Sequence, residues 1–303
     1  MKTIDVLAIG MVTIDFIYEV EHYPEEGSTS RIDKTSTWIG GTTGRAALAC
    51  AYLDAKTVFA GMVGHGIYAD LLKGLLAHEP LETQLIAAGD ESGSQHSFVL
   101  LAGKSGERTI LWTPQPRATP ACHKLCGKLI PKARCVLLDA TDLVLALAVA
   151  HACAEQNVPL VFDTGSYKPE ADAILRLTDY IIAPEKYFTA RAEARGQSYS
   201  DALAEAFREF GSKLLMATEG ERGGVYWEAE AREARRYNAA PVHVVDSCGA
   251  GDVFHGGFAY GVARGWPLPK TIDFSAWLAA QKCAELGNAG LPSAVQIPAQ
   301  FAG

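Results

Sequence analysis

The sequence predicts an α/β fold: a central, mostly parallel β-sheet with helices on both faces. Three observations lead to this prediction. From Arg134 onward, strand and helix patterns alternate, which is the rhythm of βαβ units. Residues 6–10 are apolar, as expected for a buried first strand. No repeat, linker or low-complexity block interrupts the 303 residues, so we expect a single domain spanning residues 1–303.

The other elements follow in chain order. Residues 28–38 alternate polar and apolar side chains, and residues 94–101 and 107–112 flank a glycine turn, so we expect exposed strands there. Short apolar runs predict buried strands over residues 56–61, 135–139, 160–163, 180–183, 213–217 and 242–245. Longer patterns predict a helix ending at residue 53 and helices over residues 67–77, 143–155, 184–192, 201–210, 253–263 and 274–286.

Composition and charge exclude several classes of protein. The formal net charge is −8, from 27 basic and 35 acidic residues, which argues against a nucleic-acid partner. The sequence has no run of about 18 apolar residues, so no membrane span is predicted. The N-terminus enters a strand pattern at once and lacks the layout of a signal peptide. The seven scattered cysteines indicate reduced core thiols, so we expect a cytoplasmic protein.

One stretch, residues 246–252 with the sequence D-S-C-G-A-G-D, stands between the predicted strand 242–245 and the predicted helix 253–263. Two glycines and an alanine open the helix, so its first N–H groups are uncovered. Such a helix N-terminus attracts anions through its hydrogen bonds and its dipole. Asp252 lies in the first helical turn, beside this predicted anion site.

An acid beside an anion site has two interpretations. If the carboxylate of Asp252 takes a proton from a hydroxyl that attacks a phosphate, the turn would stabilise the charge on the transferring group. The alternative is a glycine turn in which Asp252 only caps the helix.

The D-S-C-G-A-G-D stretch resembles the D-[TS]-x-G-A-G-D signature of the ribokinase-like (PfkB) carbohydrate kinases, and the resemblance covers nearly the whole chain. Residues 106–110 and 251–256 look nearest to the ketohexokinase and sulfofructose kinase branch. The resemblance implies a β-sheet lid from about residues 12–38 and 94–113 and a homodimer formed through it. It also implies transfer of the ATP γ-phosphoryl group to a hydroxyl of a small, fructose-like sugar, with Mg²⁺. Asp252 would be the base, and Gly249, Ala250 and Gly251 would form the anion hole.

The resemblance also assigns the substrate side of the site. Asp15 would hold sugar hydroxyls, although a solvated acid on an edge strand is the alternative. Gly40 and Gly41 would let the backbone approach the substrate. Arg45 stands where the family has asparagine, which places a permanent positive charge near a helix N-terminus. Either Arg45 turns outward or pairs with an acid such as Asp15 and the substrate is a neutral sugar, which we favour, or Arg45 pairs with an anionic group of the substrate.

The nucleotide side follows from a T-x-G-x-x-G loop and a late glycine turn. Thr218, Gly220 and Gly223 match the loop, and Asn288 lies in the turn that would adjoin adenine. Arg108 is either the lid arginine that reaches the phosphates or a surface arginine.

The N-x-x-E motif expected for magnesium is missing. Glu185 is the nearby candidate ligand, and magnesium could equally be held through water and phosphate.

Other motifs and functions were weighed. Residues 122–126, C-H-K-L-C, lack a second ligand pair for a metal site, and Phe98 replaces the first glycine of a P-loop ending at residue 105. A nucleoside or vitamin kinase of the same fold would need an apolar slot, which Phe98, Trp38 and Trp112 could form. A non-catalytic sugar- or nucleotide-binding regulator would explain the missing N-x-x-E, but the intact D-S-C-G-A-G-D stretch argues against it.

Overall fold

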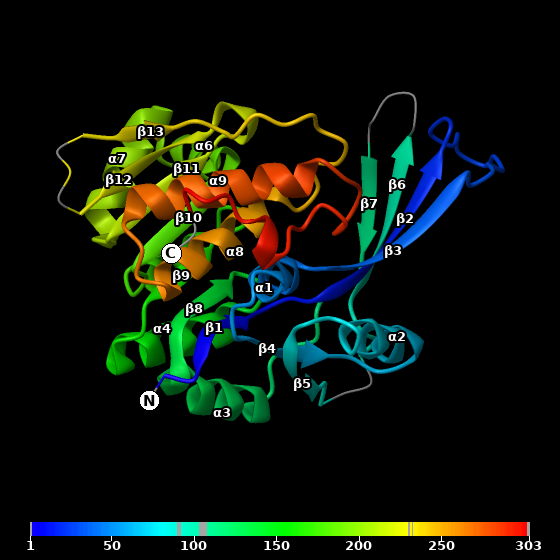
Figure 1. The fold of residues 1–303 in the computed structure, drawn as a ribbon, viewed down its shortest axis with the longest axis horizontal. Helices are drawn as coiled ribbons and strands as arrows, with labels where there is room; N and C mark the ends of the chain where they lie inside the picture. Colours follow the sequence, from blue (N-terminus) through cyan, green and yellow to red (C-terminus); the bar gives the residue numbers. More distant parts are fainter. Residues whose placement is uncertain (1, 90–91, 103–107, 230, 232, 302–303) are drawn as a thin grey trace.

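The computed structural model describes residues 2–89, 92–102, 108–229, 231 and 233–301 (Figure 1). Among these described residues, the large sheet has nine strands in the order β13-β12-β11-β10-β9-β8-β1-β4-β5. Every neighbouring pair from β11 to β5 is parallel, whereas β12 and β13 are added antiparallel. The predicted mostly parallel sheet is therefore confirmed. Its strands are β1 (Ile4–Ile9), β4 (Thr57–Val63), β5 (Glu82–Ala87), β8 (Ala133–Asp139), β9 (Leu160–Asp163), β10 (Tyr180–Pro184), β11 (Leu214–Thr218), β12 (Gly224–Glu228) and β13 (Arg235–Tyr237).

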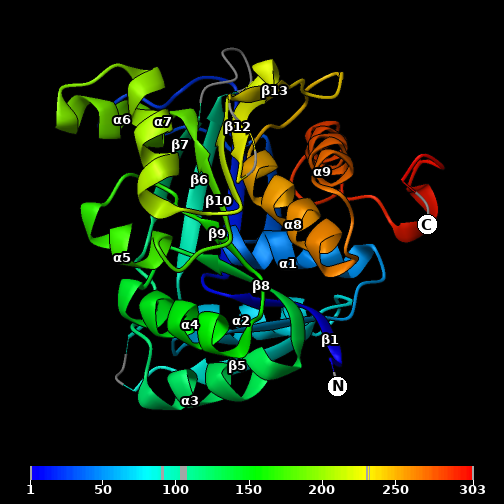
Figure 2. The same cartoon turned by 90° about the vertical axis from the view of Figure 1, so that its left-hand side faces the viewer.

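Helices cover both faces of this sheet, as Figure 2 shows. One face carries α1 (Thr42–Tyr52), α2 (Ile67–Leu76), α8 (Ala250–Ala263) and α9 (Leu268–Cys283). The other carries α3 (Pro120–Leu129), α4 (Leu143–Gln156), α5 (Asp172–Leu175), α6 (Glu185–Arg195) and α7 (Tyr199–Phe210). Successive side chains of β1 alternate between the two cores, because Val6 and Ala8 pack on the first face while Leu7 and Ile9 pack on the second.

A separate four-stranded sheet projects from one end of the molecule (Figure 1). Its order is β3-β2-β6-β7, with β2 (Thr13–Val20), β3 (Lys34–Gly40), β6 (His96–Ala102) and β7 (Arg108–Trp112). The outer pairs are antiparallel and β2 pairs with β6 in parallel. The chain passes from β1 into β2 through only three residues, 10–12, so the small sheet starts where the central strand ends. The expected small β-sheet lid is therefore present.

Several predicted boundaries are wrong. Residues 241–249 contain no strand, although 242–245 are β-branched and apolar. The amides of Val245 and Asp246 both donate to the carbonyl of Cys283, at 2.8 and 3.2 Å, so the end of α9 takes the hydrogen bonds that a strand would need. The exposed strand expected from residue 28 begins only at Lys34, and α9 begins at Leu268 rather than 274.

Two other predictions concern sequence motifs. Residues 122–126 lie in α3, and no group of three or more potential metal ligands occurs among the described residues. The glycine turn at 103–106 lies outside the described residues. Within the part of the chain that the structure describes, no helix has the length and apolarity needed to cross a bilayer.

Candidate active site

The turn that precedes α8 has two glycines with different roles. Gly249 is the N-cap of α8 and has φ of 81°, a left-handed conformation that favours glycine, and a Cβ there would overlap the Arg45 side chain. Gly251 has no such φ, and a Cβ there would meet no atom within 4 Å. A side chain at Gly251 would therefore project into open space, where a ligand could lie. The Ala250 amide, also assigned to the anion hole, donates to the Ser247 carbonyl at 3.3 Å.

Arg45 lies at the centre of the site. Its Nη1 donates to Asp252 Oδ2 at 2.7 Å and its Nη2 donates to Asp15 Oδ2 at 2.8 Å. Its Nε donates to Asn288 Oδ1 at 3.3 Å. The Arg45 side chain is only 8% exposed. Burial lowers the pKa of Arg45, but the charges of Asp252 and Asp15 outweigh burial and raise it above its usual range. Of the two structural alternatives that the sequence left open, Arg45 does not turn outward but pairs with Asp15, and the pairing with Asp252 is an addition.

Asp252 is the acid of the first turn of α8, and its side chain is 21% exposed. Burial raises the pKa of Asp252 to about 6. The nearby charge of Asp163 acts in the same direction, whereas Arg45 and His255 act against it. The carboxylate is therefore ionised at neutral pH and still able to accept a proton.

Asp15 lies on β2 and is held on both sides. Its Oδ1 accepts a hydrogen bond from Ser97 Oγ on β6 at 2.7 Å, while its Oδ2 faces Arg45. A Cβ at Gly40 would overlap the Asp15 carboxylate, which explains why this position is glycine. Gly41 has φ of 82° and is the N-cap of α1, with the Met11 carbonyl 2.6 Å from where a Cβ would stand.

A cavity of about 200 Å³ opens between the small sheet and the turn before α8. The cavity brings together Asp15, Arg45 and Arg108 from the predicted site. Arg108 is the first residue of β7 and is exposed. The Trp38 indole lies against Gly287, where any Cβ would overlap the ring. The other residues of the wall are Ile17, Val99, Leu101, Val244, Val245, Asp246, Ser247, Cys248, Leu286 and Gly287.

Two groups of buried polar residues support the turn, and the sequence analysis missed both. Lys282 of α9 is fully buried, and its Nζ donates to Asp246 Oδ2 at 2.7 Å and to the Asp246 carbonyl at 2.8 Å. Burial acts to raise the pKa of Asp246, but hydrogen bonds from Lys282 and the Cys248 amide outweigh burial and lower it below its usual range. The signal was a lysine in the predicted helix 274–286, close to the apolar residues Ala279, Ala280 and Cys283.

The second group surrounds His255 of α8. Its Nδ1 lies 2.7 Å from the Gly251 carbonyl and 3.3 Å from Asp163 Oδ2, and its Nε2 lies 3.2 Å from the Ile182 carbonyl. Asp163 ends β9 and is buried, and an acid at the carboxyl end of a buried strand is the signal that could have revealed it. The His255–Asp163 pair supports the first turn of α8 through the contact of His255 with the Gly251 carbonyl.

The nucleotide-side residues lie at the end of β11. Thr218 ends this strand, and Gly220 and Gly223 take φ of 61° and 78° around the short turn Gly220–Arg222. A Cβ at Gly223 would overlap the Tyr237 carbonyl. Asn288, assigned to the nucleotide, donates through Nδ2 to the Ile39 carbonyl at 2.7 Å and accepts from Arg45, so its side chain lies with the sugar-side residues.

Glu185, the candidate magnesium ligand, begins α6 with a 45% exposed side chain. Its Oε2 accepts a hydrogen bond from Arg222 Nη2 at 2.5 Å. Arg222 Nε also lies 3.9 Å from Glu219 Oε2, and Glu219 accepts from Arg236 at 2.6 Å. These four residues form an ionic group beside the Thr218 loop.

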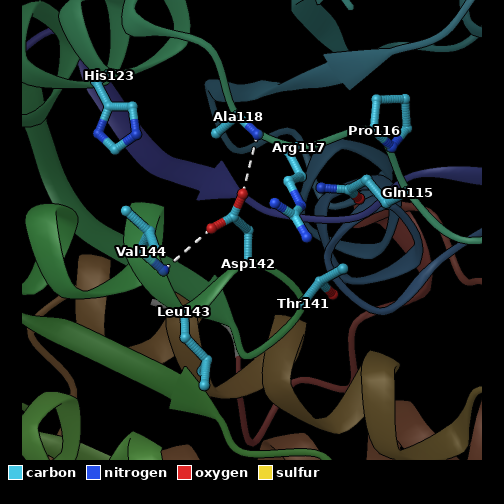
Figure 3. Close-up of a pocket in the computed structure, with 9 residues that line it drawn as sticks. All are labelled: Gln115, Pro116, Arg117, Ala118, His123, Thr141, Asp142, Leu143 and Val144. Atoms are coloured by element: carbon cyan, nitrogen blue, oxygen red, sulfur yellow. Dashed lines mark hydrogen bonds between the residues drawn. The ribbon is translucent and has the colours of Figure 1, made fainter. Parts of the chain in front are cut away.

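A second cavity, of about 430 Å³, contains none of the predicted site residues. Figure 3 shows Asp142 between the two segments of its wall, accepting from the amides of Ala118 and Val144 at 2.9 and 3.0 Å. Asp142 is the N-cap of α4, so its carboxylate is used in holding this helix. All seven cysteines are free, six of them are buried, and Cys248 is half-buried in the wall of the smaller cavity.

Comparisons with known proteins identify the family of this chain. Residues 3–294 match the family model described as "pfkB family carbohydrate kinase". The chain is 24% identical to 5-dehydro-2-deoxygluconokinase of Geobacillus thermodenitrificans, covering 91% of this chain and 86% of that one, and 24% identical to ribokinase of Haemophilus influenzae, covering 94% of each.

Solved structures show the same fold. A putative ribokinase from Agrobacterium tumefaciens superposes with a TM-score of 0.82 at 21% identity, covering 96% of this chain and 94% of that one. The Arabidopsis thaliana ribokinase complexed with ribose and ATP gives a TM-score of 0.79 at 21% identity, covering 97% of each. With a family model that spans almost its full length, this chain belongs to the pfkB family of carbohydrate kinases.

Proposed function

We propose that this kinase transfers the γ-phosphoryl group of ATP to a hydroxyl of a small, neutral, fructose-like sugar, with Asp252 as the general base. The observation that supports this most directly is the position of Asp252, beside the open space over Gly251 at the N-terminus of α8. In this proposal the amides of Gly249, Ala250 and Gly251 form the anion hole for the transferring group.

The raised pKa of Asp252 supports its role as a base. A carboxyl group with a pKa of about 6 is ionised at neutral pH. It is also a stronger base than an ordinary aspartate, so proton transfer to it is less unfavourable. Its place beside the anion hole would put the sugar hydroxyl between the base and the phosphorus.

The pairing of Arg45 supports a neutral sugar. Arg45 is already paired with two carboxylates, those of Asp15 and Asp252. An anionic group of the substrate could bind Arg45 only by displacing one of these buried ion pairs. In the proposed complex the hydroxyls of a neutral sugar share the oxygens of Asp15, while Trp38 and Val99 cover its apolar faces.

The nucleotide would lie along the Thr218–Gly223 loop, with Arg108 of the lid reaching toward its phosphates. An ATP complex of the Arabidopsis ribokinase, which shares this fold, supports ATP as the nucleotide. We keep Asn288 as a proposed contact at the junction of the sugar and nucleotide ends, because it already bonds to Arg45.

Magnesium would accompany the nucleotide, and Glu185 is the proposed protein ligand. Mg²⁺ is commonly held by one or two carboxylates together with phosphates and water, so a single exposed carboxylate fits this mode. When bound, the ion would neutralise phosphate charge. Glu185 would first have to exchange its bond to Arg222. Glu185→Gln should raise the Mg²⁺ concentration needed for half-maximal activity, and an unchanged requirement would exclude this role.

The exposed edge of the small sheet supports a homodimer through the lid. β7 is an edge strand, and its consecutive residues Ile110, Leu111 and Trp112 are 43%, 59% and 71% exposed. Exposed apolar edge strands invite pairing with a second chain. Sedimentation of wild type and of Trp112→Arg tests this, since only the wild type should dimerise.

The activity itself is tested by a screen of sugars, sugar acids, phosphosugars and nucleosides with ATP and Mg²⁺, measured as ADP release. Asp252→Asn should then lower kcat on the best acceptor by roughly 10²–10⁴-fold, the range for a positioned general base. Nucleotide binding should be retained because the shape of the side chain is unchanged. A near wild-type kcat in this variant would exclude Asp252 as the base. ADP release only with nucleosides would show that the substrate is a nucleoside and not a sugar.

A further inference from the structure

Arg45 is placed on the anion-hole turn itself. The space where a Gly249 side chain would stand is filled by the Cδ, Cζ and Nη1 atoms of Arg45. The guanidinium therefore lies against the backbone of the turn that opens α8, and it is 2.7 Å from the acid of the same turn. A phosphoryl group held by this turn would lie next to a fixed positive charge.

The guanidinium is held in one orientation by three partners. They come from β2, α8 and the loop after α9, and they are Asp15, Asp252 and Asn288. With its side chain only 8% exposed, Arg45 has little freedom to turn toward solvent. Charges fixed in a buried site stabilise a transition state without the cost of reorganisation.

We propose that Arg45 is a further catalytic residue, whose charge stabilises the phosphoryl group during transfer. This inference rests on the function proposed above. In the reaction the sugar O–H bond breaks, its proton goes to Asp252, and the freed oxygen pair bonds to the γ-phosphorus. The bond from the γ-phosphorus to the β–γ bridging oxygen breaks, and its electron pair leaves with ADP.

The proton transfer changes the partner of Arg45. In the resting enzyme the guanidinium is balanced by the charge of Asp252. Once Asp252 has taken the proton it is neutral, and the charge of Arg45 is no longer balanced from that side. At that moment the negative charge on the transferring group is spread over its equatorial oxygens. The arginine therefore interacts more strongly with the transition state than with the ground state, as catalysis requires.

A purely structural role accounts less well for an arginine. A positive charge in the first turn of α1 opposes the helix dipole. Pairing with Arg45 also lowers the pKa of Asp252 and so weakens it as a base. A neutral side chain that hydrogen-bonded Asp15 would avoid both disadvantages.

The experiment compares wild type, Arg45→Gln, Arg45→Lys and the control Arg176→Gln, an arginine that pairs with Glu209 outside the proposed site. Each protein is assayed for kcat and titrated by calorimetry with ADP alone and with ADP, aluminium fluoride, Mg²⁺ and sugar, the fluoride standing in for the transferring phosphoryl group. Arg45→Gln should lower kcat by roughly 10³-fold, the lower end of what a transition-state arginine supplies. It should lose the tighter binding of the fluoride complex and keep the affinity for ADP.

Arg45→Lys should fall between Arg45→Gln and wild type, because it keeps the charge and loses the planar fork. Wild-type kcat and fluoride-complex affinity in Arg45→Gln would overturn the inference, as would an equal loss of affinity for ADP alone and for the fluoride complex. If Arg45→Gln does not fold, a folded Arg45→Lys decides: retained tightening by fluoride supports the inference and its loss overturns it. A near wild-type kcat in Asp252→Asn would instead exclude Asp252 as the base, and wild type that releases no ADP with any acceptor would refute the proposed function.

Discussion

Two arginines of this enzyme each lie between two acids, at opposite ends of the proposed site. Arg45 joins Asp15 to Asp252 with a side chain that is 8% exposed. Arg222 joins Glu185 to Glu219 with a side chain that is 56% exposed. The residue types match, and the difference is burial.

The difference in burial gives the two groups different physical roles. Breaking a buried ion pair typically costs about 3–5 kcal/mol, because a charge is left without a partner. An exposed pair contributes only about 0–1 kcal/mol and is screened by salt. The Arg45 group therefore holds one geometry, while the Arg222 group can exchange partners. In the proposed site, the reacting end would be fixed and the nucleotide end would be adaptable.

The largest effect should come from filling the open space at the fixed end. Gly251→Val places a side chain where no protein atom lies within 4 Å, so it should occupy the position of the phosphoryl group. We expect kcat to fall by at least about 10²-fold, comparable to the loss of an oxyanion-hole donor. ADP release measures kcat, and thermal unfolding checks that the fold persists.

The matched control for this change is Gly74→Val, which adds the same side chain to open space on the exposed side of α2. Its kcat should equal that of wild type. If Gly251→Val also kept its activity, the space over Gly251 would not be the phosphoryl site.

The next effect concerns stability and sharpens the contrast between buried and exposed pairs. Lys282→Met leaves the carboxylate of Asp246 without its buried ammonium partner, so we expect about 3–5 kcal/mol of destabilisation. Arg222→Met removes an exposed pair and should change stability by about 0–1 kcal/mol. Urea unfolding of both variants measures the free energies, and equal losses would contradict the distinction drawn from burial.

The smallest effect is on the pH dependence of the reaction. Because the pKa of Asp252 is raised to about 6, kcat/KM should decline below pH 6 by about tenfold per unit as the base is protonated. The sign for stability is opposite. A carboxyl pKa raised above its unfolded value of 3.8 favours folding at low pH, and this contribution disappears as the pH rises through 6.

Arg45→Gln provides the check on this profile. Arg45 lowers the pKa of Asp252, so its removal should move the acid limb of kcat/KM to higher pH. If the acid limb of the kcat/KM profile does not move in Arg45→Gln, the group that titrates there is not Asp252.

The sequence predicted the fold well because its signals are local. Strand and helix periods, and the seven contiguous residues 246–252, can be read without knowing any tertiary contact. The strand expected at 242–245 failed for the opposite reason. Its β-branched side chains favour a strand, but the Cys283 carbonyl takes the amides of Val245 and Asp246.

The candidate site was less predictable, because its central contacts join distant residues. Arg45 lies 30 residues from Asp15, 207 from Asp252 and 243 from Asn288, so spacing alone could not reveal the group. Pairing with Asp15 was foreseen as an alternative, and pairing with Asp252 was not. Lys282 was hidden because a buried charge in an apolar helix looks like a solvated one until its partner is known.

The half-buried thiol of Cys248 gives the enzyme a place for covalent chemistry beside the anion-hole turn. The other six thiols are buried and so out of reach of a reagent in solution, and burial also raises the pKa of Cys50 and Cys153 to about 12. A thiol-directed fluorophore would therefore attach first in the wall of the small cavity. Its emission would report directly when that cavity is filled, without any turnover.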